Sequence, residues 1–121
     1  MAATKLDPAT DAVDVQLHVD EDVHGTTTTI ALQGEWDLAG QVQMRNQFQR
    51  VLERSPETVV LDLSALSFID STGINGVIEL QRRSLAQHVR LVIVPGPEAV
   101  QLPFEILGLA GTLPCLTAPR E

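Results

Sequence analysis

The sequence VVLDLSALSFIDSTGINGVI, residues 59–78, decides how the rest of the chain is arranged. Its first part, 59–63, is a dense run of aliphatic residues and predicts a buried strand. A short connection, 64–69, leads to the polar segment 70–73, which offers several helix N-caps in a row. Apolar residues then recur at helical spacing as far as Leu85. The stretch therefore predicts a strand that leads into a helix through a polar turn, and sites gather at such junctions in open α/β sheets.

The composition is that of one globular domain. The chain has 121 residues, of which 44% are hydrophobic and 20% are charged, so it is long enough to bury a core. Aromatic residues make up only 3%, and the core should therefore be mostly aliphatic. We expect a mobile N-terminal tail over residues 1–11, a single domain over 12–117 and a short C-terminal tail over 118–121.

The net charge and the cysteine count indicate which binding partners and which cellular compartment to expect. The net charge is -8, from 8 basic and 16 acidic residues, which makes nucleic acid a poor partner because phosphate binding needs clustered Lys and Arg. No run approaches the roughly 20 apolar residues of a membrane helix, so no direct membrane insertion is expected. The N-terminus lacks the pattern of a signal peptide. Cys115 is the only cysteine, and we expect a cytoplasmic location.

Two strands are expected near the N-terminal side of the domain. Between residues 13 and 19, apolar residues alternate with polar ones, as in a strand with one buried face. The charged segment 20–25 ends in glycine and predicts a turn. The β-branched segment 27–32 predicts a second strand. The two strands should form an antiparallel hairpin.

Helices and one more strand follow. Over residues 39–54, apolar side chains recur every three or four residues, which predicts an amphipathic helix. Asp37 can cap this helix, and Pro56 marks its end. The helix of the quoted stretch should run to about Gln87, and a short apolar strand should occupy 90–94.

A third helix is expected over residues 98–107. Its inward-facing residues should be Val100, Phe104 and Leu107. Pro103 should either fall in the first turn of a helix that starts late or kink the helix. Gly108 can provide a left-handed cap, and segment 113–116 could add a last edge strand. The fold class is then α/β, in the order β-β-α-β-α-β-α-(β), with a mixed sheet of four to five strands and about three packed helices.

The quoted stretch resembles the signature of STAS domains, named after sulphate transporters and anti-sigma factor antagonists. That signature is an aliphatic strand with an Asp, a short loop, a hydrophobic pair and then Asp-Ser-Ser/Thr-Gly at the start of a helix. Segment 34–37 resembles the Gly-x-x-Asp of the family, and segment 104–109 resembles its late helix, which ends in Gly-Leu. The resemblance covers about residues 13–116 and implies the same order of elements.

The resemblance also implies a function and a site. In free-standing bacterial members, the Ser after the Asp accepts phosphate from an anti-sigma factor that is a serine kinase, which makes Ser71 the expected phosphoacceptor. The unphosphorylated protein would bind the kinase and release a sigma factor, and a separate serine phosphatase would restore binding. ATP would belong to the partner, and no cofactor is expected here. The implied partner-binding residues are Asp37, Asp70, Thr72, Gly73 and Asn75.

This sequence departs from the family pattern at two positions. Thr72 stands where a second Ser is commoner, and Asn75 stands where Gly or Ala is usual. Neither change removes the phosphoacceptor, but Asn75 could alter the choice of partner. Without the resemblance, spacing alone would favour a plain helix cap formed by one of the three polar residues 70–72.

The sequence gives little support for catalysis or for binding of a metal or a nucleotide. A catalytic role for Ser71 needs a base within reach, and the pattern places none of His18, His24 and His88 beside it. There is no Gly-x-Ser-x-Gly elbow, no metal-ligand spacing and no phosphate-binding loop. We therefore expect a protein that is not an enzyme and binds no metal.

Three residues near the junction allow two roles each. Trp36 can be an exposed anchor for a partner or can cover the edge of the core. Gly73 and Gly76 can keep a docking surface low or let the helix pack closely on the sheet. The sequence leaves these alternatives open.

Two other functions remain in competition with the antagonist. One is a soluble STAS subunit of a membrane transporter, and the other is a scaffold subunit of a larger stress-signalling complex. The intact Asp-Ser-Thr-Gly turn disfavours the first. The expected oligomeric state is a monomer, because the pattern shows no contiguous apolar surface.

Overall fold

A four-stranded sheet carries the helices of the domain. The structure, a computed structural model, describes residues 16–108. Its elements are, in order, β1 (Leu17–His24), β2 (Thr27–Trp36), α2 (Leu38–Glu53), β3 (Thr58–Ile69), α3 (Ser71–Ala86), β4 (Arg90–Val94) and α4 (Glu98–Ile106). The predicted α/β class and order are confirmed, and the edge strand expected over 113–116 lies outside the described residues.

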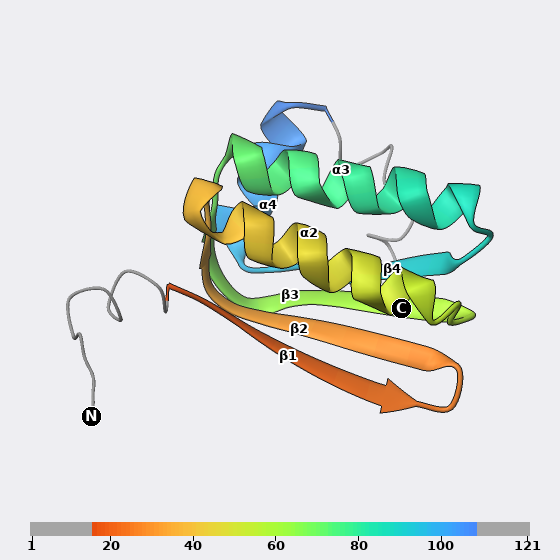
Figure 1. Ribbon diagram of the computed structural model, residues 1–121. Coiled ribbons are helices and arrows are strands. Elements are labelled where there is room, and N and C mark those ends of the chain that lie inside the picture. Colours follow the sequence, from red (N-terminus) through yellow and green to blue (C-terminus); the bar gives the residue numbers. More distant parts are fainter. Residues whose placement is uncertain (1–15, 109–121) are drawn as a thin grey trace, which may run out of the picture.

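The strands lie side by side in the order β1-β2-β3-β4. β1 and β2 are antiparallel, as the predicted hairpin requires, whereas β2–β3 and β3–β4 are parallel. Each parallel pair is joined through a helix, and both connections step along the sheet in the same direction. Because such crossovers are right-handed, α2 and α3 lie on the same face of the sheet, next to each other (Figure 1).

The core fills the space between the sheet and the helices. Alternate residues of the strands point into it, as in a half-covered sheet. The fully buried side chains include Ile30 and Leu32 of β2, Leu61 and Leu63 of β3, Met44 of α2, Val77 and Leu80 of α3 and Phe104 of α4. As expected from the composition, most of them are aliphatic.

The turn predicted at 20–25 is wrong, because β1 continues to His24. Its acidic residues pair with β2, for example Glu21 with Ile30. β1 is an edge strand, and charged side chains are a common protection of such edges. The Glu21 carboxylate faces α2 and accepts hydrogen bonds from Gln47 and Arg54. The chain reverses at Gly25 instead, whose φ of 64° suits a glycine.

The connection predicted at 64–69 is also wrong, since β3 runs without a break to Ile69. It pairs there with the second half of β2, and the last pair joins Trp36 and Ile69. Two irregularities interrupt this register, one between Ala31 and Gln33 and one between Gly34 and Glu35. Bulges of this kind break the alternation of buried and exposed residues, which is why the sequence pattern resembled a loop.

The ends of the last two helices differ from expectation in detail. α4 begins at Glu98, so Pro103 lies inside the helix, and the expected late start is wrong. Phe104 is buried as predicted, but Leu107 is 57% exposed because it is the C-cap. Gly108 follows with φ of 73°, the left-handed conformation expected of it. Leu85 of α3 is likewise exposed, and Ser84 faces the core in its place.

Candidate functional site

The candidate site lies where two adjacent parallel strands each lead into a helix. β2 and β3 end together at the pair Trp36–Ile69. The backbone N–H of Asp70 donates to the Trp36 carbonyl at 3.2 Å, so the two chains are still side by side as they leave the sheet. Asp37 and Asp70 are the N-caps of α2 and α3, and these two helices begin at the same edge of the sheet (Figure 1).

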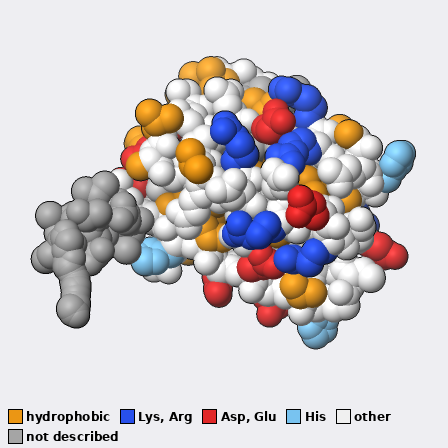
Figure 2. Space-filling view, in the orientation of Figure 1, with side chains coloured by type: hydrophobic (Ala, Val, Ile, Leu, Met, Phe, Trp, Pro, Cys, Tyr) orange, Lys and Arg blue, Asp and Glu red, His pale blue; other side chains and the backbone are white. Residues whose placement is uncertain are grey.

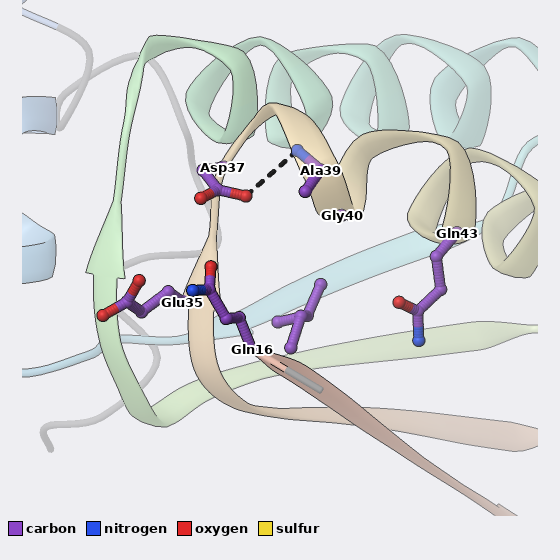
Figure 3. A pocket seen from close by; sticks show the side chains of 7 residues that line it. Gln16, Glu35, Asp37, Ala39, Gly40 and Gln43 are labelled. Carbon is purple, nitrogen blue, oxygen red and sulfur yellow. Dashed lines mark hydrogen bonds between the residues drawn. The ribbon is translucent and has the colours of Figure 1, made fainter. Parts of the chain in front are cut away.

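Both aspartates cap their helices. One oxygen of Asp37, Oδ1, accepts from the N–H of Ala39 at 3.0 Å, as drawn in Figure 3. Asp70 Oδ1 accepts from the N–H of Gly73 at 3.1 Å. Each bond satisfies an N–H that has no partner inside the helix. The capping role predicted for Asp37 is confirmed, and among the candidates at 70–72 the cap is Asp70.

Because Asp70 is the cap, Ser71 occupies the first helical position and its side chain is exposed. The next residues divide by helical position: Thr72 is half-buried, Gly73 is buried and Asn75 is exposed. Ser71 and Asn75 are one turn apart and so lie on the same side of α3. The structure thus brings together Asp37, Asp70, Ser71, Thr72 and Asn75, and places Gly73 beneath them.

No histidine in the described part of the chain forms a hydrogen bond with Ser71. His88 follows the C-terminal end of α3, whereas Ser71 begins that helix. His24 pairs with Thr27, at the end of β2 farthest from Trp36. His18, on β1, is exposed. The geometry therefore offers Ser71 no imidazole base of the kind that activates a catalytic serine.

Trp36 belongs to the core. Its side chain is fully buried, and its indole N–H donates to Gln41 Oε1 at 3.1 Å. Its ring meets that of Phe48 edge-on, with centroids 6.0 Å apart and an interplanar angle of 67°. Of the two roles open from the sequence, the exposed anchor is wrong and the core role is correct.

Gly73 and Gly76 allow α3 to approach Trp36. A Cβ atom on Gly73 would lie 2.5 Å from Ile69 Cγ1 and 2.9 Å from the Trp36 carbonyl oxygen. A Cβ on Gly76 would lie 2.5 Å from Trp36 Cζ2. All three distances are far below van der Waals contact. Close packing is therefore the role that the structure shows, and partner binding by Gly73 stays a prediction.

Exposed apolar side chains, which the sequence reading missed, occur at this end of the domain. Leu38 and Val42 are one turn apart on α2 and are 73% and 62% exposed, and Phe68 near the end of β3 is 45% exposed. Figure 2 shows apolar side chains at the end of the helical layer where α2 and α3 begin. The sequence pattern could have revealed two of these residues, because Leu38 and Val42 fall outside the buried stripe of α2. We call Leu38, Val42, Phe68, Ser71 and Asn75 the Ser71 surface.

A small polar pocket of about 240 Å³ lies beside Asp37 at the start of α2. It is lined by Gln16, Leu17, Glu35, Asp37, Ala39, Gly40 and Gln43 (Figure 3). Among residues 16–108, no group of three or more His, Cys, Asp and Glu side chains could hold a metal ion. No helix of the same part of the chain is long and apolar enough to cross a membrane.

A comparison with known families identifies the family to which this fold belongs. The family described as "Mlab, STAS domain" matches residues 19–117. The chain belongs to the STAS domain family. Among characterised members, the anti-sigma-F factor antagonist RsfB of Mycobacterium tuberculosis is 25% identical over 89 residues, which are 74% of this chain and 72% of that protein.

Solved structures of anti-sigma factor antagonists show the same fold. An anti-sigma factor antagonist from Mycobacterium paratuberculosis superposes with a TM-score of 0.76 at 22% identity, over 85% of this chain and 87% of that one. The antagonist SpoIIAA in its unphosphorylated form gives 0.72 at 24% identity, over 86% and 90%. SpoIIAA, a Bacillus cell fate determinant, is also solved in a phosphorylated form, with a TM-score of 0.67 at 24% identity over 86% and 93%. This chain is thus an anti-sigma factor antagonist-like STAS domain at low identity.

Proposed function

We propose that this STAS domain is a phosphorylation-switched anti-sigma factor antagonist. Its unphosphorylated form binds a serine-kinase anti-sigma factor, so that a sigma factor is released, and phosphorylation of Ser71 abolishes that binding. The named relatives support the class of function. The observation that carries the site is the position of Ser71, whose hydroxyl is exposed at the start of α3 while Asp70 serves as the cap.

A phosphate on Ser71 is compatible with the fold. It would carry about -1.5 to -2 charges at neutral pH and would stand at the positive end of the α3 dipole, an interaction of about 0.3–1 kcal/mol. Since the Ser71 side chain is exposed, no core residue has to move. Asp37 and Asp70, the acidic residues at this edge, would add repulsion instead. The modified domain should therefore stay folded while its surface changes.

The effect on a partner would be large. The five side chains of the Ser71 surface are apolar or uncharged, so a partner that packs against them buries no charge of these residues, and the carboxylates of Asp37 and Asp70 lie beside them. A phosphate at its centre would be buried unpaired in the same complex, and an uncompensated buried charge costs about 3–5 kcal/mol. Such a cost lowers affinity by two orders of magnitude or more, which is enough for an on/off switch.

In this proposal the protein is the substrate of the kinase-type anti-sigma factor and also its binding partner. ATP and the kinase site belong to the anti-sigma factor, and a separate serine phosphatase removes the phosphate. The protein works as a monomer in the cytoplasm. Thr72 and Asn75 contribute to the docking surface beside Ser71, and Asp37 and Asp70 orient the two helix starts.

The test is the intact mass of the purified protein after incubation with ATP and a kinase-type anti-sigma factor from the same bacterium. We expect a gain of one phosphate in the wild type and in Ser64→Ala, a control that removes another exposed serine, but none in Ser71→Ala. A gain that persists in Ser71→Ala would assign the phosphate to a different residue. No gain in any variant, with a kinase shown to be active, would refute the proposal.

A further inference from the structure

A second surface of the domain is a groove between α2 and α3, of about 390 Å³. Its walls are formed by Gln41, Arg45 and Phe48 from α2 and by Asn75, Glu79 and Arg83 from α3. Asn75 also belongs to the Ser71 surface, so the groove begins where that surface ends. It then extends along the helices toward Arg83.

The floor of the groove is tightly packed. Gly76 lies in it, directly over the Trp36 ring. The Gln41 amide is held by its bond from the Trp36 indole N–H, and Phe48 is buried against the same ring. A partner that enters the groove therefore meets a preformed shape.

The two arginines of the groove differ from the other arginines of the helical layer. Arg50 donates to Gln47, Arg54 pairs with Glu21, and Arg82 pairs with Glu79. Arg45 and Arg83 have no ion pair and no side-chain hydrogen bond within residues 16–108. Arg83 is also half-buried. The groove thus presents two cations, one from each wall, that have no partner in the described part of the chain.

Charge is unevenly distributed over the described residues. α2 with its cap Arg54, together with α3, carries five arginines and two glutamates. The rest of the described chain carries ten acidic residues and one arginine, Arg90. Figure 2 shows this helical face, with several Arg side chains over it and acidic side chains among them. The helical layer of an acidic protein therefore carries more basic than acidic side chains, which favours an acidic partner on this face.

We propose that this groove binds an acidic segment of the anti-sigma factor, with carboxylates of that segment pairing with Arg45 and Arg83. This inference rests on the proposed function, since it names a second contact of the same complex. Guanidinium groups form charge-assisted, often bidentate hydrogen bonds with carboxylates. The contact would add affinity and orientation beside the Ser71 surface.

Charge complementarity favours a protein segment over nucleic acid. A short acidic segment touches only the positive helical layer, whereas a nucleic acid strand would extend over the acidic remainder of the domain. The continuity of the groove with the Ser71 surface, through Asn75, also favours the same protein partner. Arg83 lies twelve residues after Ser71 on α3, which is about 18 Å along the axis, so the two contacts can be altered separately.

The experiment measures the affinity of the unphosphorylated protein for the anti-sigma factor by calorimetry, for the wild type, Arg45→Glu, Arg83→Glu and Arg90→Glu. Arg90→Glu is the matched control, since it makes the same charge change outside the groove. We expect losses of about tenfold or more for the two groove variants and less than about twofold for Arg90→Glu. The losses should shrink at 1 M salt, where the Debye length is about 3 Å.

The affinities of these variants distinguish a failure of the groove contact from a failure of the proposed function. If Arg45→Glu and Arg83→Glu bind as the wild type does while Ser71→Glu does not bind, the groove is not used and the proposed function stands. If the wild type itself binds no kinase-type anti-sigma factor, the proposed function fails, and with it this partner.

A direct probe of the groove uses the labelled protein alone. In nuclear magnetic resonance titrations, a hexaglutamate peptide should shift the Arg45 and Arg83 side-chain signals more than those of Arg90, and hexalysine should not. Equal shifts with inorganic phosphate would mean a site for small anions and would overturn the assignment to an acidic segment. Circular dichroism of each variant confirms that it is folded.

Discussion

The backbone N–H of Asp70 donates to the carbonyl of Trp36 at 3.2 Å, and this bond joins the ends of β2 and β3. Each strand then gives way to a helix that an aspartate caps. The relationship explains how the domain places two helix N-termini, two carboxylates and Ser71 at one edge. Trp36, buried beneath them, contacts both glycines of the α3 start. The candidate site is therefore supported directly by the core.

The close packing of α3 against Trp36 can be tested by comparing Gly76→Ala with Gly40→Ala. The new Cβ at position 76 would lie 2.5 Å from the rigid Trp36 ring, whereas at position 40 it would lie 2.8 Å from a methyl of Leu17, at the far end of a flexible side chain. We expect Gly76→Ala to lower the free energy of unfolding by about 1–3 kcal/mol and Gly40→Ala to change it much less. Urea denaturation measures both. Equal effects would contradict the proposed packing.

The capping hydrogen bond of Asp70 predicts that two substitutions of this residue lower the stability of the protein by different amounts. Asp70→Ala removes the acceptor of the Gly73 N–H and should lower the free energy of unfolding by about 1 kcal/mol. Asp70→Asn keeps an acceptor oxygen and should lose less, although it also loses the charge at the helix start. Denaturant unfolding at neutral pH distinguishes the two. A loss in Asp70→Asn as large as that in Asp70→Ala would mean that charge outweighs the hydrogen bond.

Ser84 predicts a substitution that stabilises the protein. Its hydroxyl is buried on the core side of α3 and has no hydrogen-bond partner among residues 16–108. Ser84→Ala removes this unsatisfied group and improves helix propensity, and it should raise the free energy of unfolding by up to about 1 kcal/mol. Ser71→Ala, at an exposed position of the same helix, should stay within about 0.5 kcal/mol of the wild type. A clear loss of stability in Ser84→Ala would show that the hydroxyl is satisfied.

Much of the fold could be predicted from local patterns. The buried strand 59–63, the helical spacing after it and the cap at Asp37 all depend on neighbours in the chain, and the structure confirms them. The extension of β3 to Ile69 could not be predicted in this way. It depends on a bulged pairing with β2, a strand more than thirty residues earlier, and bulges erase the alternation that marks a strand.

The position of the candidate site could be predicted in part. One motif pointed to the cluster around Ser71, and the edge of the sheet brings its residues together, but the functional role of these residues stays a prediction. The role of Gly73 and Gly76 depends on Trp36, which no local pattern connects to them. The groove with Arg45 and Arg83 was missed for the same reason, because its two walls come from helices that meet only in the folded protein.

The exposed apolar residues of the Ser71 surface lead to the prediction that tests the docking site most directly. Leu38→Ala and Phe68→Ala should each weaken binding to the anti-sigma factor by about tenfold, because both side chains are exposed here and would be desolvated in the complex. Neither change should lower the melting temperature much, since neither side chain belongs to the core.

The matched control for these two variants is Leu85→Ala. Leu85 is 68% exposed, as Leu38 is 73% exposed, but it lies near the other end of α3, fourteen residues after Ser71. The control should bind the anti-sigma factor as the wild type does. Equal losses in all three variants would show that apolar exposure in general, and not the Ser71 surface, determines binding. Wild-type affinity in Leu38→Ala and Phe68→Ala would place the interface elsewhere, because a partner that covers Ser71 with a standard interface of about 800 Å² per side must also cover its apolar neighbours.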